Sequence, residues 1–174
     1  TERGSAKKYA DRRPDGYQWK YKHINLTNYS PDAYVEAINA AVRYGAGVIV
    51  IDSTSHAWEA PGGILDLHSK FGGRFQDWAK ANPHHYNFIN AILDCPVHVI
   101  CCARSKMDYG LEEKQDGTKA VVKFGMAPVQ RNNFLYEFDF VLDMDYTHVG
   151  RVDKTRCDEM DGKSVMKPGP DFFA

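Results

Sequence analysis

Two short apolar runs, each preceded by a helical pattern and each ending in a charged residue, constrain the fold most strongly. The first covers residues 48–51 and ends in Asp52. The second covers residues 97–103 and ends in Arg104. Continuous runs rich in β-branched residues are typical of buried parallel strands that are covered on both faces. Because a helix precedes each run, the pattern predicts an α/β domain with a mainly parallel sheet, whose chemistry lies beyond the carboxyl ends of the strands.

The helices ahead of these runs have defined starts in the sequence. Ser30 and Pro31 provide an N-cap hydroxyl followed by proline at the first helical position, and Gly45 ends the apolar pattern that follows. Asn82 and Pro83 predict the start of the second helix in the same way. Two successive helix-to-strand units therefore organise this part of the chain.

The rest of the chain is less regular. Residues 53–81 form an insertion rich in Gly, His and Trp at the active edge of the sheet, where long irregular segments are often functional. The other predicted features are a short helix at 64–69, a hairpin at 111–124, antiparallel strands at 138–144 and 149–153, and a flexible tail at 167–174.

Composition limits the classes of protein to consider. With 174 residues, 43% of them hydrophobic and 26% charged, the chain is expected to form one domain over residues 1–166. The formal net charge of −1 argues against a uniformly basic coat for nucleic acid but leaves room for a local basic strip.

No apolar run approaches the roughly 20 residues that span a bilayer, so we expect a cytoplasmic protein without membrane contact. The four cysteines, with Cys101 and Cys102 adjacent, are expected to be reduced core residues.

The first strand and its aspartate have the form of a Walker B strand. In such strands a rigid backbone presents one carboxylate, here Asp52 followed by Ser53, to a hydrated Mg²⁺ on nucleotide phosphates. Parallel strands also end in aspartate for helix-capping or loop reasons, so the strand alone leaves both interpretations open.

Two other segments resemble parts of RecA-type ATPases. The start of the chain, with Glu2, resembles the segment that carries the glutamate activating the hydrolytic water, and Glu2 stands 50 residues before Asp52, close to the spacing in that family. Residues 151–156 resemble the late-strand pattern through which RecA-like subunits reach a neighbour's γ-phosphate, with Lys154 and Arg156 at the matching positions.

Further motifs narrow the resemblance. They are Asp52-Ser53, residues 56–59, residues 62–68, residues 104–106, residues 125–131 and residues 136–140. Together they resemble the AAA-type nucleotide-binding proteins of phages, including RecA-like single-strand annealing recombinases. The resemblance implies a RecA-like αβα sandwich with a C-terminal antiparallel extension, and ATP with Mg²⁺ as ligands. It also implies a homo-oligomer, ring or filament, that acts on single-stranded DNA in the cytoplasm of the host cell.

The sequence departs from that family at one point. It contains no G-x-x-x-x-G-K-[ST] motif, and the pairs Gly62-Gly63 and Gly72-Gly73 lack the following lysine and come after the Walker B strand. We therefore expect the chain to begin downstream of the phosphate-binding loop, and to bind ATP poorly without it.

Arg104 and Lys106, after the second strand, each have two interpretations. Arg104 either senses the γ-phosphate, as the polar residue at this point does in RecA-like proteins, or caps a structural carboxylate such as Glu59. Lys106 either serves the same site or DNA, or is a solvated surface lysine.

Basic and aromatic residues alternate in the insertion, as in proteins that bind single strands through the backbone and stacked bases. The candidates are Lys70, Arg74 and Trp78, with Trp58, Phe71, Phe75 and Lys80 beside them, and Lys106, Lys123 and Arg131 further along the chain. The alternative is that these aromatic residues form the core of a small helical subdomain. Adjacent His84 and His85 would point about 100° apart on a helix, which disfavours a shared metal ion.

Together with these patterns, the resemblance implies an ATPase that couples nucleotide binding at a subunit interface to single-stranded DNA. Three alternatives stay open: a nucleotide-binding scaffold without productive hydrolysis, a helicase-type motor or its loader, and a metal-dependent nuclease. DNA cleavage that needs a divalent metal ion but no ATP would distinguish the nuclease.

Overall fold

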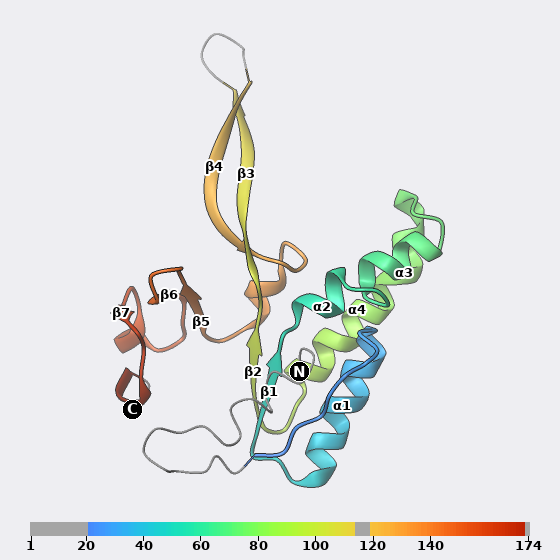
Figure 1. The fold of residues 1–174 in the computed structure, drawn as a ribbon, viewed down its shortest axis with the longest axis horizontal. Coiled ribbons are helices and arrows are strands. Elements are labelled where there is room, and N and C mark those ends of the chain that lie inside the picture. Colours follow the sequence, from blue (N-terminus) through green and yellow to red (C-terminus); the bar gives the residue numbers. More distant parts are fainter. Residues whose placement is uncertain (1–20, 114–118, 173–174) are drawn as a thin grey trace. The chain divides into compact units, whose positions relative to one another are not determined.

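The computed structural model describes residues 21–113 and 119–172, which belong to two compact units, residues 1–130 and 131–174. Among the described residues, the first unit carries four α-helices, a parallel strand pair and a hairpin, and the second unit carries three short strands (Figure 1). The chain therefore has an α/β fold. In the part of the chain that the structure describes, no helix is long and apolar enough to cross a membrane.

Helix α1, Pro31–Tyr44, begins and ends where the sequence predicts. Ser30 is the N-cap, and its hydroxyl oxygen accepts a hydrogen bond from the N–H of Ala33 at 3.3 Å. Gly45 ends the helix with φ +88°, a left-handed conformation that glycine adopts without steric cost. Tyr34 and Ile38 form its buried face.

Strands β1, Val48–Asp52, and β2, His98–Cys102, pair in parallel, as predicted. The register places Asp52 opposite Cys102, so both strands end at the same edge. On the covered face, Ile49 and Ile51 are buried with apolar residues of α1 and of α4, Trp78–Leu93. These two helices lie on the same side of the strand pair in Figure 1.

The expectation that both faces of these strands are covered is wrong for the described residues. Val48, Val50 and Ile100 are 52%, 57% and 53% exposed, because side chains of both β1 and β2 alternate between a more covered and a more exposed face. The sheet contains two strands among the residues described, and one of its faces is open. Cys102 lies exposed at the end of β2 and Cys157 is exposed in the second unit, so neither is the core cysteine that we expected.

Three short elements precede α4. They are α2, Ser55–Glu59, α3, Ile64–Lys70, and the 3-10 turn η2, Phe75–Asp77. Helix α3 confirms the predicted short helix. The predicted start of α4 is wrong, because the helix begins at Trp78 and Pro83 lies inside it. Proline there removes one backbone donor, and burial of the first turns, with Ala81 fully buried, offsets that loss.

The predicted hairpin is present and longer than expected. Its strands are β3, Ser105–Glu113, and β4, Lys119–Pro128, which pair antiparallel with a register shift at Asp108/Tyr109 (Figure 1). The predicted turn at residues 115–118 lies outside the described residues.

The second unit is a small antiparallel sheet in the order β5-β6-β7. Its strands are Val141–Met144, Val149–Lys154 and Ser164–Met166, and its 3-10 turns are η3, Phe134–Glu137, η4, Asp158–Met160, and η5, Pro170–Phe172. The predicted antiparallel pair is confirmed, although β5 begins three residues later than expected. Phe134 and Val152 are buried, and Phe138 packs edge-on against Phe134. In the C-terminal segment, the Lys167 N–H donates to the carbonyl of His148 at 2.7 Å.

Candidate functional site

The candidate site is the carboxyl edge of the β1–β2 pair. Asp52 is the last residue of β1 and is partly exposed. The peptide bond between Asp52 and Ser53 is cis, and the three residues that follow Asp52 are almost fully buried: Ser53, Thr54 and Ser55. The buried turn after Asp52 therefore fixes the backbone of this residue, while its carboxylate reaches solvent at the end of the strand.

The turn of residues 53–55 is fixed to the end of β2. Both the N–H and the hydroxyl of Thr54 donate to the carbonyl of Cys102, at 2.9 and 3.1 Å. The N–H of Arg104 donates to the hydroxyl oxygen of Ser55 at 2.9 Å. These hydrogen bonds extend the strand pairing beyond Asp52 and connect the two strand ends where the sequence predicts the chemistry.

Side chains from two other elements hold the same turn. The Tyr34 hydroxyl, from α1, donates to the carbonyl of Ser53 at 3.0 Å. The Gln130 side-chain amide, just after β4, donates to the carbonyl of Thr54 at 2.9 Å. Sequence reasoning missed both contacts, because Tyr34 lies within the apolar pattern that follows Pro31 and Gln130 lies within the motif at 125–131.

His56 lies one turn further on, in α2. Its Nδ1 is 3.4 Å from the Ser53 hydroxyl oxygen, and its ring stacks on Tyr29 with the centroids 4.7 Å apart. Ser53 is therefore enclosed by protein groups, and the Asp52 carboxylate is the more accessible oxygen donor of the pair.

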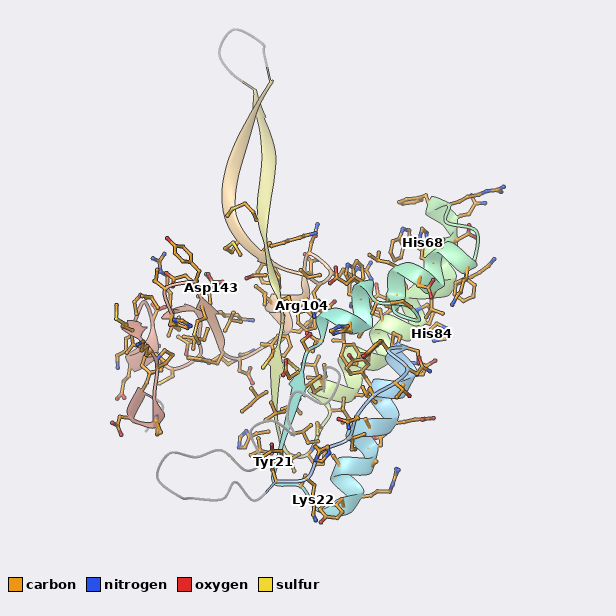
Figure 2. The ribbon with its side chains drawn as sticks, in the orientation of Figure 1. Tyr21, Lys22, His68, His84, Arg104 and Asp143 are labelled. Atoms are coloured by element: carbon orange, nitrogen blue, oxygen red, sulfur yellow. The ribbon has the colours of Figure 1, made fainter. Side chains whose placement is uncertain are left out.

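Arg104 lies at this edge (Figure 2), and its side chain has an acidic partner. Its guanidinium Nη1 is 3.9 Å from the carboxylate of Glu59, and both side chains are about half exposed. The structure therefore places Arg104 as the capping interpretation predicts, within reach of the strand end. An exposed pair of this kind contributes roughly 0–1 kcal/mol to stability, so the interaction does not lock the arginine in place.

Neither glycine pair of the insertion forms a phosphate cradle, because their N–H groups already donate within the protein. The N–H groups of Gly63, Gly72 and Gly73 donate to the carbonyls of Ala60, Ser69 and His68. The N–H of Gly62 donates to the Asp66 carboxylate at 2.7 Å, and the Lys70 ammonium contacts the same oxygen. The hydrogen bond from Lys70, and then that from Gly62, lower the pKa of the Asp66 carboxyl. A carboxylate already occupies the place that a phosphate oxygen would need.

The predicted DNA-binding residues of the insertion are only partly available. Trp78 stacks on His68 and on Trp58, with the centroids 4.0 and 6.1 Å apart. This supports the helical-core alternative for the two tryptophans. Lys70 is paired with Asp66 at 2.7 Å, whereas Arg74 is exposed and the Phe75 side chain is 93% exposed.

The remaining candidates belong to other elements or lie outside the described residues. Glu2 and the side chain of Lys123 lie outside the residues that the structure describes. Lys106 is exposed at the start of β3. In the second unit, Arg131 is half-buried, Lys154 donates to the carbonyl of Tyr136 at 2.5 Å, and Arg156 pairs with Asp139 at 2.5 Å.

The histidines have separate surroundings. His68 and His84 are labelled in Figure 2. His84 Nδ1 is 3.0 Å from an oxygen of Asp32, His68 Nε2 is 2.9 Å from the carbonyl oxygen of Arg74, and His85 is buried. Among the described residues, no group of three or more His, Cys, Asp or Glu side chains could hold a metal ion. A Mg²⁺ ion bound through a single carboxylate, waters and phosphates needs no such group, and Asp52 fits that requirement.

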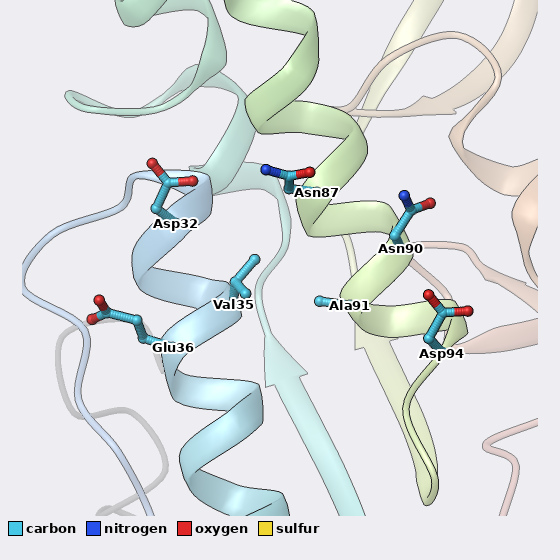
Figure 3. Close-up of a pocket in the computed structure, with 7 residues that line it drawn as sticks. All are labelled: Asp32, Val35, Glu36, Asn87, Asn90, Ala91 and Asp94. Atoms are coloured by element: carbon cyan, nitrogen blue, oxygen red, sulfur yellow. The ribbon is translucent and has the colours of Figure 1, made fainter.

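A groove of about 440 Å³ lies between α1 and α4 (Figure 3). Its lining residues are Asp32, Val35, Glu36, Asn87, Asn90, Ala91 and Asp94. Three carboxylates and no cation would repel nucleotide phosphates. The groove is therefore a poor nucleotide site, and the edge at Asp52 is the better candidate.

The two cysteine thiols at the end of β2 have raised pKa values. Although Cys102 as a whole residue is exposed, partial desolvation of its thiol by the surrounding protein, and then the charge of Asp52, raise the pKa of that thiol. Burial raises the pKa of Cys101 to about 12, with Cys102 as a second cause. Both thiols are therefore protonated at neutral pH and are poor nucleophiles.

Comparison with known proteins defines the class. The sequence profile of an AAA domain family matches residues 1–169, so the chain belongs to that family of AAA/P-loop-type nucleotide-binding proteins. AAA domains typically bind a nucleotide together with Mg²⁺, which agrees with a carboxylate at the end of a parallel strand. No curated protein and no solved structure matches the chain.

Proposed function

We propose that this chain forms the core of a RecA-like, Mg²⁺-dependent ATPase of phage type that acts on single-stranded DNA in recombination or annealing. The observation that carries the proposal is the position of Asp52. It ends a parallel strand, beside the end of the next strand, in a chain of the AAA domain family. This is the placement that a Walker B carboxylate needs.

Each role follows from the chemistry of phosphoryl transfer. Asp52 would hold Mg²⁺ through water, with Ser53 fixing the backbone behind it, and the ion would neutralise charge on the phosphates. Glu2 would orient the attacking water. Arg104 would exchange Glu59 for the γ-phosphate, since the 3.9 Å contact between exposed groups is weak.

The open face of the β1–β2 pair supports the RecA-like sandwich. Val48, Val50 and Ile100 expose apolar surface on one side, whereas α1 and α4 cover the other. Parallel sheets are almost always covered on both faces. A second layer packed on this face would complete an αβα sandwich.

The working form would be a homo-oligomer, ring or filament, in the cytoplasm of the host cell. Lys154 and Arg156 would act on the nucleotide of the adjacent subunit, leaving their partners Tyr136 and Asp139. Arg74, Lys70, Lys106 and Arg131 would contact the DNA backbone.

The test is ATP hydrolysis by the natural full-length polypeptide, with and without single-stranded DNA, and with Asp52→Asn as control. DNA-stimulated turnover that Asp52→Asn abolishes supports the proposal. Turnover that survives Asp52→Asn removes the carboxylate from the mechanism.

A nucleotide-binding scaffold without turnover is the second candidate. The contacts of Arg104 with Glu59 and of Arg156 with Asp139 favour it, because both arginines already have acidic partners. Nucleotide binding without hydrolysis, in the presence of DNA, would support this candidate. Directional unwinding of a duplex would instead identify a helicase-type motor.

A further inference from the structure

The turn behind Asp52 is held from two sides by buried side chains. Tyr34 is 4% exposed and donates to the carbonyl of Ser53, and Gln130 is 6% exposed and donates to the carbonyl of Thr54. The two donors come from α1 and from the segment after β4, which are distant in sequence. Two consecutive peptide groups are thus oriented by independent parts of the first unit.

Orientation of these peptide groups determines where the Asp52 carboxylate lies. Ser53 follows Asp52 directly, so rotation of the 53–54 backbone would tilt the end of β1 and move its last side chain. The hydrogen bonds from Thr54 to Cys102 restrain one end of the turn. The carbonyl of Ser53 accepts a hydrogen bond from Tyr34, and the carbonyl of Thr54 accepts one from Gln130 and another from the N–H of Ala57.

We propose that Gln130 and Tyr34 are positioning residues, which hold the Asp52 turn in the geometry that productive binding of Mg²⁺ and nucleotide requires. This inference rests on the proposed ATPase function. Both side chains act through the backbone of the turn, because the carbonyls that accept their hydrogen bonds belong to it. Such a role requires their polar atoms, whereas a role in packing alone requires only their volume.

Near-isosteric variants separate these two roles. Gln130→Met keeps the length of the side chain and loses the donor, and Tyr34→Phe removes only the hydroxyl. Gln130→Glu keeps the shape and, when ionised, directs a carboxylate oxygen at the carbonyl of Thr54. Protonation at lower pH gives that glutamate an O–H, which can donate to the same carbonyl.

The experiment measures kcat and KM for Mg²⁺-ATP against pH in the natural full-length polypeptide. Misplacement of a catalytic group by about 1 Å costs up to roughly 100-fold, so we expect kcat of Gln130→Met to fall by about 10-fold or more. Gln130→Glu should recover activity relative to wild type as the pH falls, and Gln130→Met should not. Tyr44→Phe, on the exposed part of α1, is the control with wild-type kinetics.

Amide hydrogen exchange gives a readout that does not depend on turnover. The N–H groups of Thr54 and Ala57 donate to Cys102 and Thr54, and they should exchange faster in Gln130→Met while α4 stays protected. Wild-type kinetics and exchange in Gln130→Met would overturn the inference and leave the ATPase standing. A wild-type protein without turnover, but with faster exchange in the variant, would overturn the ATPase and support control of the turn by Gln130.

Discussion

Asp52 and Cys102 are register partners at the ends of β1 and β2, and the charge of Asp52 adds to burial in raising the pKa of the Cys102 thiol. The negative charge of the Asp52 carboxylate therefore disfavours ionisation of a thiol on the neighbouring strand. It does so at the edge that we propose as the nucleotide site.

Cysteine alkylation tests this relationship. A raised pKa leaves little thiolate at a given pH, so Cys101 and Cys102 should react slowly with iodoacetamide at about pH 8, whereas exposed Cys157 should react quickly. Asp52→Asn removes one cause of the shift, so the pKa of Cys102 should fall and its alkylation should accelerate. Mass spectrometry of each cysteine against pH measures this. An unchanged pH profile for Cys102 in Asp52→Asn would show that burial alone sets its pKa.

Glu2→Gln should abolish turnover and preserve nucleotide binding in the natural full-length polypeptide. The amide can still form hydrogen bonds but cannot orient and activate the attacking water as a carboxylate does. Single-turnover kinetics and a fluorescent-nucleotide titration measure the two effects. Retained turnover would remove Glu2 from the mechanism.

Substitutions of Arg104 and of Glu59 should have similarly small effects on stability but different effects on turnover. Because both side chains are half exposed, Arg104→Gln and Glu59→Gln should each change the free energy of unfolding by less than about 1 kcal/mol. Arg104→Gln should reduce turnover, and Glu59→Gln should not, because it only releases the arginine. Equal loss of turnover in both variants would mean that the pair acts as a structural unit.

Gly63→Ala should destabilise the first unit. A Cβ atom at this position would lie 2.7 Å from the carbonyl oxygen of His56 and 2.9 Å from that of Ala60. Both contacts are to backbone, so relief requires movement of α2, at a cost of roughly 1–3 kcal/mol. Gly47→Ala, where no atom lies within 4 Å, is the matched control. Urea unfolding of the two variants measures the difference.

Phe75→Ala and Trp78→Ala should have different effects. Phe75 is 93% exposed, so its loss should spare stability and weaken single-stranded DNA binding by roughly 1–3 kcal/mol if it stacks on a base. Trp78 packs on His68 and Trp58, so its loss should lower the melting temperature. Fluorescence anisotropy and thermal unfolding measure these outcomes. Unchanged DNA affinity in Phe75→Ala would exclude stacking by this ring.

Local signals in the sequence were sufficient to predict several elements. Ser30, Pro31 and Gly45 predicted both ends of α1, and two β-branched runs predicted the parallel strands with Asp52 at the end of the first. These signals are local, because capping and strand propensity depend on residues a few positions apart. The family-like motifs also identified the AAA domain class.

The surroundings of Asp52 depend on the tertiary structure. Gln130 reaches Thr54 across 76 positions of sequence, and no local pattern encodes that contact. The start of α4 at Trp78 likewise depends on packing against Trp58 and His68, which overrides the helix-start signal at Pro83. Long-range hydrogen bonds and ring contacts form only when separate elements pack together. The packing of the helices and strands therefore determines these contacts, and the local sequence pattern does not.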